Sequence, residues 1–300
     1  MRVIIPVDGS ASSSEAIRFI GERARYMSEK PVSELIYVEP PIPDDVIDRI
    51  DIDALRRAYE ASAKQKAAGS EAISRAAGLA SETKVLEGDC GPAIAREAKA
   101  FRAGLIAMGS RGRSPAKSFF LGSVSRSVIE HAGLPVLLVR EKGLPERESL
   151  RILLAVDGSE YGGKAAGFIV ENAALFGPRP SVDVIFVTLD YTGIARDEVD
   201  FIAPESARAY LGKEAEGDWE KAVKPVVDIL ASAGIEAKPV RRAGDPAGEI
   251  ARYAAENADL IVMGSHGWGR LKSAVLGSTA TKVGALTQTP VLLVPSADAS

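Results

Sequence analysis

One glycine motif occurs twice in this chain with the same internal spacing. Residues 105–123 read LIAMGSRGRSPAKSFFLGS, and residues 260–278 read LIVMGSHGWGRLKSAVLGS. Each copy places an apolar run before Gly-x-x-Gly, nine further residues and Gly-Ser, and the copies are offset by 155 residues (264 − 109). Because glycine adopts backbone conformations that other residues avoid, a spacing repeated in this way indicates one backbone geometry built twice.

Other landmarks are repeated in the same order, which predicts a duplicated domain and not a short-period solenoid. We expect domains at residues 1–141 and 150–300, and the charged, Gly- and Pro-containing stretch REKGLPERES makes 142–149 the natural linker. The repeated pairs are IIPVDGS at 4–10 with LLAVDGS at 153–159, EGDCGPAIA at 87–95 with AGDPAGEIA at 243–251, and LPVLLV at 134–139 with TPVLLV at 289–294.

Apolar runs alternate with helical patterns in each half. The runs are rich in Val, Ile and Leu without polar alternation, which is typical of parallel strands covered by helices on both faces. The alternation predicts a doubly wound α/β fold with right-handed crossovers. In the first half we expect strands at 2–7, 32–38, 83–87, 104–108 and 135–139, and helices at 12–28, within 52–77, at 92–101 and from about residue 122.

Composition excludes several classes of protein. The net charge is −4, so no general attraction to nucleic acid or to an anionic membrane is expected. The apolar runs are far shorter than the roughly 20 residues that span a bilayer. A single cysteine, Cys90, excludes an intramolecular disulfide and a cysteine-based zinc cluster. Met1 leads directly into a strand-like segment without a signal-peptide pattern, so we expect a soluble, cytoplasmic protein.

The glycine loops predict a place for a ligand. In a doubly wound sheet, ligands bind beyond the carboxyl ends of the strands, where the strand order reverses. Gly109 and Gly112 would let the backbone approach a ligand closely, since neither carries a Cβ. Gly122-Ser123 falls where the last helix begins, and free amides with the helix dipole suit a phosphate group. Neither copy is a P-loop, because Ala116 and Leu271 replace the glycine required before the lysine.

Several other residues have a functional and a structural interpretation. Asp8 and Asp157 could place Mg²⁺ or abstract a proton, but an Asp before Gly-Ser and a helix is typical of helix capping or ribose contact. Cys90 precedes a helix, whose dipole could lower the thiol pKa, but its counterpart in the second half is Pro246, so a redox role is not expected. His131 near a helix end is expected to stabilise that end locally. Trp219 is expected to anchor an amphipathic helix.

Together these landmarks resemble a universal stress protein domain: PVDGS after the first strand, GDP-like residues before the third helix, and Gly-x-x-Gly-x9-Gly-Ser before a final PVLLV strand. Two such domains resemble the tandem subclass, and the resemblance covers essentially the whole chain. It implies an α/β fold with two five-stranded parallel sheets in the order 3-2-1-4-5, of the adenine nucleotide alpha hydrolase-like type. It also implies that strands 135–139 and 290–294 pair across a pseudo-twofold axis as an internal dimer.

Members of this family that keep the glycine motif bind adenine nucleotides, so the resemblance implies ATP or AMP at up to two sites. Mg²⁺ would accompany ATP, and no protein-held metal is expected. At the matching positions, Asp faces the nucleoside, Val offers backbone to adenine, Met-Gly lies under the ribose, and the glycines and hydroxyls hold phosphates. The implied residues are Pro6, Val7, Asp8, Val38, Met108, Gly109, Arg111, Gly112, Gly122, Ser123, Val124 and Ser125 in the first half, and Ala155, Val156, Asp157, Val187, Met263, Gly264, His266, Gly267, Gly277, Ser278 and Thr279 in the second.

Two departures predict unequal sites. Ala280 replaces Ser125, and His266 replaces Arg111, so we expect the first site to hold phosphate more tightly. The function implied is that of a stress-response or regulatory protein whose nucleotide biases its conformation or its binding of an unidentified protein partner. Self-association into a homodimer stays open. The alternatives are a weak Mg-dependent ATPase and a pure interaction module in which the glycine loops are structural.

Overall fold

Strands and helices alternate along the chain as the sequence predicts. A computed structural model describes residues 1–39, 52–110, 122–140, 147–188, 205–265 and 276–295. The elements of the first half are β1 (Arg2–Pro6), α1 (Ala11–Ala24), β2 (Val32–Glu39), α3 (Ile52–Ala76), β3 (Ser81–Glu87), α4 (Cys90–Ala100), β4 (Leu105–Gly109), α5 (Ser123–Ala132) and β5 (Val136–Val139). Those of the second half are β6 (Arg151–Val156), α6 (Glu160–Glu171), α7 (Ala173–Phe176), β7 (Ser181–Thr188), α9 (Glu205–Ser232), β8 (Glu236–Ala243), α10 (Pro246–Asn257), β9 (Leu260–Gly264), α11 (Ser278–Leu286) and β10 (Val291–Val294).

The strands of the two halves form one ten-stranded sheet in the order β3-β2-β1-β4-β5-β10-β9-β6-β7-β8. Each half has the predicted order 3-2-1-4-5, and within each half neighbouring strands are parallel. The halves join through β5 and β10, which pair antiparallel with Leu137 opposite Leu292. The predicted pairing of the last strands is therefore confirmed, and it merges the two sheets into one. It also covers two Val-Leu-Leu-Val edges that would otherwise be free to aggregate.

Helices cover both faces of this sheet. On one face, Val3 and Ile5 pack with residues of α1, α3, α6 and α9. On the other face, Ile4 packs with residues of α4, α5, α10 and α11. Burial on both faces explains why the strands lack polar alternation. Each cluster contains residues from both halves, so the core runs continuously through the β5–β10 junction.

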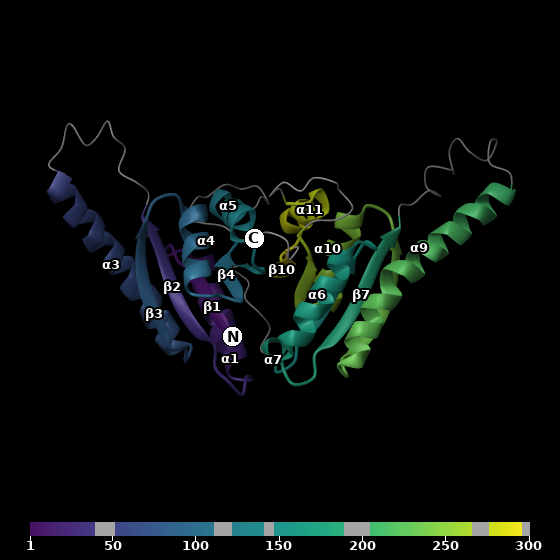
Figure 1. The fold of residues 1–300 in the computed structure, drawn as a ribbon, viewed down its shortest axis with the longest axis horizontal. Helices are drawn as coiled ribbons and strands as arrows, with labels where there is room; N and C mark the ends of the chain where they lie inside the picture. Colours follow the sequence, from purple (N-terminus) through teal and green to yellow (C-terminus); the bar gives the residue numbers. More distant parts are fainter. Residues whose placement is uncertain (40–51, 111–121, 141–146, 189–204, 266–275, 296–300) are drawn as a thin grey trace.

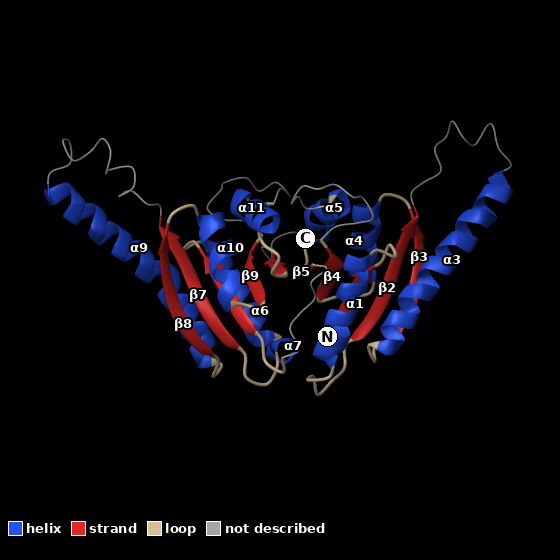
Figure 2. Ribbon diagram, turned by 180° about the vertical axis from the view of Figure 1, so that it is seen from behind, coloured by secondary structure: helices blue, strands red, loops and turns tan. Residues whose placement is uncertain are grey.

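The two halves are arranged symmetrically about that junction. Figures 1 and 2 show α3 and α9 at the two outer flanks, and α5 and α11 along the same edge of the molecule. The first helix ends earlier than its predicted limit at residue 28. The amides of Arg25 and Tyr26 donate to the carbonyls of Glu22 and Arg23, three residues back, and this tighter turn ends the helix after Ala24.

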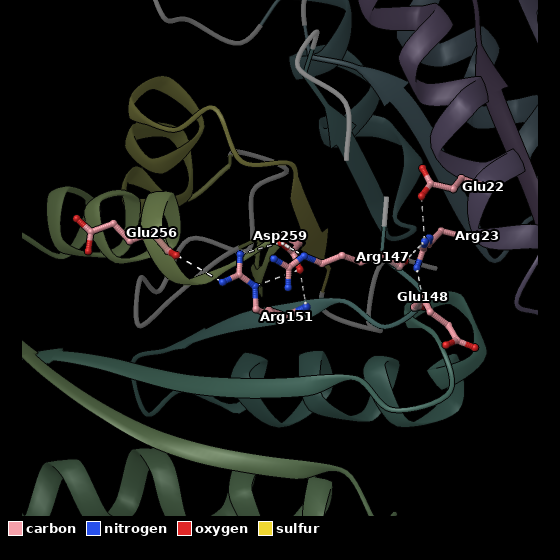
Figure 3. Close-up of polar contacts among 7 residues, drawn as sticks. All are labelled: Glu22, Arg23, Arg147, Glu148, Arg151, Glu256 and Asp259. Atoms are coloured by element: carbon pink, nitrogen blue, oxygen red, sulfur yellow. Dashed lines mark hydrogen bonds and ion pairs between the residues drawn. The ribbon is translucent and has the colours of Figure 1, made fainter. Parts of the chain in front are cut away.

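A buried arginine of the first half holds the start of the second half (Figure 3). Arg23 of α1 has 0% exposure and donates from Nη1 to the carbonyl of Glu148 at 3.1 Å and from Nη2 to the carbonyl of Arg147 at 2.5 Å. Its guanidinium also lies 4.7 Å from the ring centroid of Tyr26. The predicted linker thus ends in a segment whose backbone is bound by the first domain, while its residues 142–146 lie outside the described ranges.

A buried carboxylate of the second half holds the same segment from the other side. Asp259 accepts from the Arg151 amide at 2.9 Å and from Arg151 Nη2 at 3.0 Å, and Arg147 Nε lies 3.8 Å from Asp259 Oδ1. Because the arginines neutralise a carboxylate that is almost wholly buried, this cluster avoids the cost of an unpaired buried charge. Arg23 and Asp259 together fix how the chain enters β6.

A second buried arginine crosses the junction. Arg140 follows β5, is only 3% exposed, and donates from Nη2 to the carbonyl of Gly284 in α11. A cation near the last carbonyls of a helix is favourable to its dipole. The first half therefore supports the helix whose opposite end begins at the second glycine motif. No described helix is long and apolar enough to cross a lipid bilayer.

Candidate functional site

The sequence-predicted segments meet at one edge of each half. Strands β1, β2 and β4 are parallel neighbours, so their carboxyl ends lie together. In the second half β6, β7 and β9 are arranged in the same way. This places Pro6, Val7, Asp8, Val38, Met108 and Gly109 at one edge, and Ala155, Val156, Asp157, Val187, Met263 and Gly264 at its counterpart.

Both glycine loops are closed at the neck by the same backbone hydrogen bonds. Gly122 donates its amide to the carbonyl of Ser110 at 3.1 Å, and Gly277 donates to Ser265 at 2.8 Å. The amides of the two serines donate in turn to the last residues of β5 and β10, each at 2.9 Å. The repeated spacing therefore corresponds to a repeated backbone arrangement. The loop residues Arg111, Gly112, His266 and Gly267 lie outside the described residues.

The helices that follow these loops begin without a capping side chain. Gly122 and Gly277 are the N-caps of α5 and α11, with nearly equal backbone angles (φ −58°, ψ 152° and φ −57°, ψ 147°). The first amides bonded within the helices are those of Arg126 and Thr281, which donate to Gly122 and Gly277. An uncapped helix start directs amides and the positive end of the helix dipole outward, which suits an anion. The preceding amides belong to Ser123, Val124 and Ser125, and to Ser278, Thr279 and Ala280.

The two aspartates after the first strands fix the turn that precedes a helix. The Ser10 amide donates to Asp8 Oδ1 at 2.9 Å, and Ser10 Oγ accepts from the Ser13 amide at 3.2 Å. The capping side chain of α1 is thus Ser10, which Asp8 holds in place. In the second half Asp157 Oδ1 accepts from both the amide and the hydroxyl of Ser159. These contacts agree with the structural interpretation of the aspartates.

Gly109 is required by helix packing, not only by a ligand. A Cβ on Gly109 would lie 2.6 Å from Ser12 Oγ and 2.8 Å from the Ser12 carbonyl carbon, so α1 itself needs the glycine. The buried hydroxyl of Ser125 donates to the Gly109 carbonyl at 3.2 Å. That hydroxyl is committed to the protein, and Ser125 can offer a ligand its backbone amide. Thr281 likewise donates its hydroxyl to the Gly277 carbonyl at 3.0 Å.

The outer side of each site carries residues that the sequence analysis did not single out. Leu86 of β3 is paired in register with Val38, and both pack with Cys90 against the core. At the matching register position, Arg242 of β8 is paired with Val187. The signal was present in the repeated EGDCGPAIA and AGDPAGEIA segments, which align residue 86 with residue 242.

The position of Cys90 at the start of α4 does not activate its thiol. Partial burial raises the pKa of the Cys90 thiol above its ordinary value, and the negative charges of Asp89 and Asp8 raise it further. Backbone hydrogen bonding at the start of α4 opposes this shift without overcoming it. A raised pKa keeps the thiol protonated at neutral pH, so Cys90 acts as part of the apolar wall beside Val38.

The other two residues considered in the sequence, His131 and Trp219, make contacts that stabilise the fold. His131 Nδ1 lies 2.8 Å from the Ser127 carbonyl in the last turn of α5, which ends at Gly133 in the left-handed conformation. Trp219 of α9 packs edge-on against Phe186, as its predicted anchoring role requires. Within the described ranges, no group of three or more His, Cys, Asp or Glu is placed to hold a metal ion.

A cavity of about 540 Å³ lies away from these residues, and we do not assign it to the site. Its wall includes Tyr26, which precedes β2, and the segment Gly177–Pro180, which precedes β7. It also includes Glu236, the first residue of β8. It therefore opens at the amino-terminal edge of the strands, opposite the glycine loops.

Comparison with known proteins agrees with this architecture. The model of the universal stress protein family matches residues 1–140 and again residues 149–295. A universal stress protein of Mycolicibacterium smegmatis is 26% identical over 97% of this chain and 96% of its own length. A solved universal stress protein structure from Archaeoglobus fulgidus superposes with a TM-score of 0.67, covering 98% of both chains at 23% identity. This chain belongs to the universal stress protein family, as a tandem member with one domain of the family in each half.

Proposed function

We propose that this protein binds an adenine nucleotide, ATP or AMP, at the loop-and-helix edge of one or both halves. The observation that carries the proposal is the pair of uncapped helix starts at Gly122 and Gly277, each joined to the end of a central strand through the same closed loop neck. These starts would hold phosphates through the amides of residues 123–125 and 278–280. The backbone at Val38 and Val187 would face the base.

The nucleotide would act as a regulatory ligand. A ligand shifts a conformational equilibrium only by binding its two states with different affinity. The loops between Ser110 and Gly122 and between Ser265 and Gly277 are the segments whose conformation a bound phosphate would favour. The backbone hydrogen bonds that close the loops also join Ser110 to β5 and Ser265 to β10. They would couple the loop conformation to these two strands at the junction of the halves. On this proposal the protein is a stress-response regulator acting through a protein partner.

The two sites would differ in strength, but not through the Ser125 hydroxyl. That hydroxyl is committed to the Gly109 carbonyl, so the replacement by Ala280 removes a structural hydrogen bond and not a phosphate donor. Among the loop residues that the resemblance assigns to the sites, the difference is Arg111 against His266. A guanidinium always carries its charge and can form paired hydrogen bonds to phosphate, so the first site would be tighter at neutral pH.

The direct test is to denature freshly purified protein and identify any released nucleotide with its ratio to chain. Between one and two adenine nucleotides per chain would support the proposal. Release of ADP in place of ATP would favour the weak ATPase. No released nucleotide, followed by no binding on titration with ATP or AMP, would contradict the proposal and favour an interaction module whose glycine loops are structural.

A further inference from the structure

The outer walls of the two sites differ in one residue at an equivalent register position. Leu86 lies opposite Val38 in the β2–β3 pair, and Arg242 lies opposite Val187 in the β7–β8 pair. Paired residues of neighbouring strands project to the same face of a sheet. The first site therefore has an isobutyl group, and the second a guanidinium, beside the strand end that is proposed to meet the base.

Arg242 is held in place by its neighbours. Its guanidinium carbon lies 5.2 Å from the ring centroid of Tyr253 in α10, and its carbonyl accepts from Thr188 Oγ1 at 3.2 Å. The Tyr253 hydroxyl donates to Asp183 at 2.7 Å, which fixes the ring beneath the guanidinium. Neither described contact of Arg242 supplies a negative charge, and its side chain is exposed. A planar cation with no acidic partner among the described residues thus stands at this rim.

A guanidinium discriminates between purines by their hydrogen-bonding edges. It has only donors, and guanine presents two acceptors, O6 and N7, to a paired contact. Adenine presents one acceptor beside an amino donor, so it matches a guanidinium less well. The wall of Leu86, Val38 and Cys90 offers only the weak donor of the Cys90 thiol, and no paired donor that would favour guanine.

We propose that the two sites select different bases, and that Arg242 makes the second site prefer a guanine nucleotide while the first prefers an adenine nucleotide. This inference rests on the proposed nucleotide-binding function and replaces adenine by guanine as the preferred base of the second site. Arg242 is the selecting residue, and Tyr253 with Asp183 is its support. The protein would then respond to two nucleotide pools through two halves that share a backbone design.

The experiment is calorimetric titration of the full-length, nucleotide-free protein with GTP and separately with ATP. The wild-type protein should show one GTP site. Arg242→Leu, which installs the residue of the first half, should weaken GTP binding about tenfold or more, because a paired contact of this kind is worth about 1–3 kcal/mol. The tighter ATP site should keep its affinity. Leu86→Arg should create a second GTP site.

Arg241→Leu is the matched control. Arg241 is the neighbouring arginine of the same strand, and it lies over Trp219 on the opposite face of the sheet, 5.9 Å from that ring centroid. Its substitution removes the same charge and should leave GTP binding unchanged. Arg242→Lys keeps the charge without the planar fork, so it should also weaken GTP binding. Thermal unfolding of each variant shows that the fold is retained.

The outcomes separate the two proposals. ATP binding without GTP binding, or GTP binding unaffected by Arg242→Leu, would overturn the base selection and leave the nucleotide-binding proposal standing. GTP affinity fully retained by Arg242→Lys would assign the effect to charge alone and would also overturn the base selection. Absence of binding by both nucleotides would contradict the proposed function itself.

Discussion

Each half carries a carboxylate at the same position of its second strand, and the halves neutralise it differently. In the first half, Glu34 is 3% exposed and lies 2.8 Å from Lys84 Nζ, which also lies 2.9 Å from Glu97. In the second half, Asp183 accepts from the hydroxyl of Tyr253 at 2.7 Å.

The sequence repeat aligns these groups. Glu97 corresponds to Tyr253 and Lys84 to Val240, with the offset of 156 residues that also relates Glu87 to Ala243. The two halves therefore keep the backbone hydrogen bonds of their loop necks while the polar chemistry beneath α4 and α10 has diverged. Backbone geometry is what the halves share, and side chains are where they can acquire different properties.

The largest effect is expected from Lys84→Met, because it leaves Glu34 buried without its cation. One oxygen of Glu34, Oε2, already has no hydrogen-bond partner among the described residues. Hydrogen bonds to Glu34 and then Glu97 raise the pKa of Lys84, so its ammonium group stays charged at neutral pH. We expect the melting temperature to fall further than in any variant below.

The double variant Glu34→Gln with Lys84→Met is the companion to that experiment. It removes the charge together with its partner, so it should recover part of the loss in melting temperature. An unchanged melting temperature in Lys84→Met would mean that the buried carboxylate does not depend on this lysine.

Gly109→Ala tests whether the glycine motif has a structural component. The new Cβ would meet the backbone of Ser12 at 2.8 Å, so α1 must shift, and a destabilisation of about 1–3 kcal/mol is expected. Gly167→Ala in α6 is the control, since no atom lies within 4 Å of its added Cβ. That control should be neutral or stabilise the helix by up to about 1 kcal/mol. Equal effects in urea unfolding would show that the Ser12 contact does not constrain Gly109.

Tyr253→Phe should lower stability by about 1–2 kcal/mol at neutral pH, because Asp183 loses a donor in a partly exposed setting. Burial, then the hydrogen bond and charge of Asp183, raise the pKa of Tyr253 to about 12 from its ordinary value of about 10. The folded pKa lies above the unfolded one, so this stabilisation is fully present below about pH 10 and is lost as the pH rises through about 12. Melting temperatures measured from pH 9 to 12 should converge for wild type and variant. A constant difference over that range would refute the assigned contact.

The smallest effect is expected from Ser125→Ala, which gives the first half the residue of the second. Loss of the hydrogen bond to the Gly109 carbonyl should cost about 0.5–1.5 kcal/mol and leave ATP affinity unchanged. Ser123→Ala, at an exposed position in the same turn, should change stability by less than about 0.5 kcal/mol. A tenfold loss of ATP affinity in Ser125→Ala would show instead that its hydroxyl contacts phosphate.

The sheet was predictable because its signals are local. Apolar runs such as LIAMG and PVLLV mark buried parallel strands, and the repeated order of landmarks gave the duplication. The resemblance then supplied the strand order and the junction of the two halves. The meeting of the candidate site residues at one edge followed from the strand ends, since parallel strands bring their carboxyl ends together.

Tertiary contacts between distant residues could not be predicted from the sequence. No sequence neighbour of Arg23 indicates that its side chain will be fully buried against carbonyls that lie more than one hundred residues away in the chain. The contact between Gly109 and Ser12 requires the packing of α1 on β4, and the direction of the Cys90 pKa shift depends on its burial. Ser125 illustrates the same point. Its position in the first turn of α5 does not by itself show whether its hydroxyl faces a ligand or, as observed, the Gly109 carbonyl.

A crystal structure determined from crystals of the full chain soaked with ATP and Mg²⁺ would test the nucleotide-binding proposal most directly. We expect phosphate oxygens within hydrogen-bonding distance of the amides of Ser123, Val124 and Ser125, with the base beside Val38. Density for ATP at another place, or none at these helix starts at saturating ATP, would contradict the proposal.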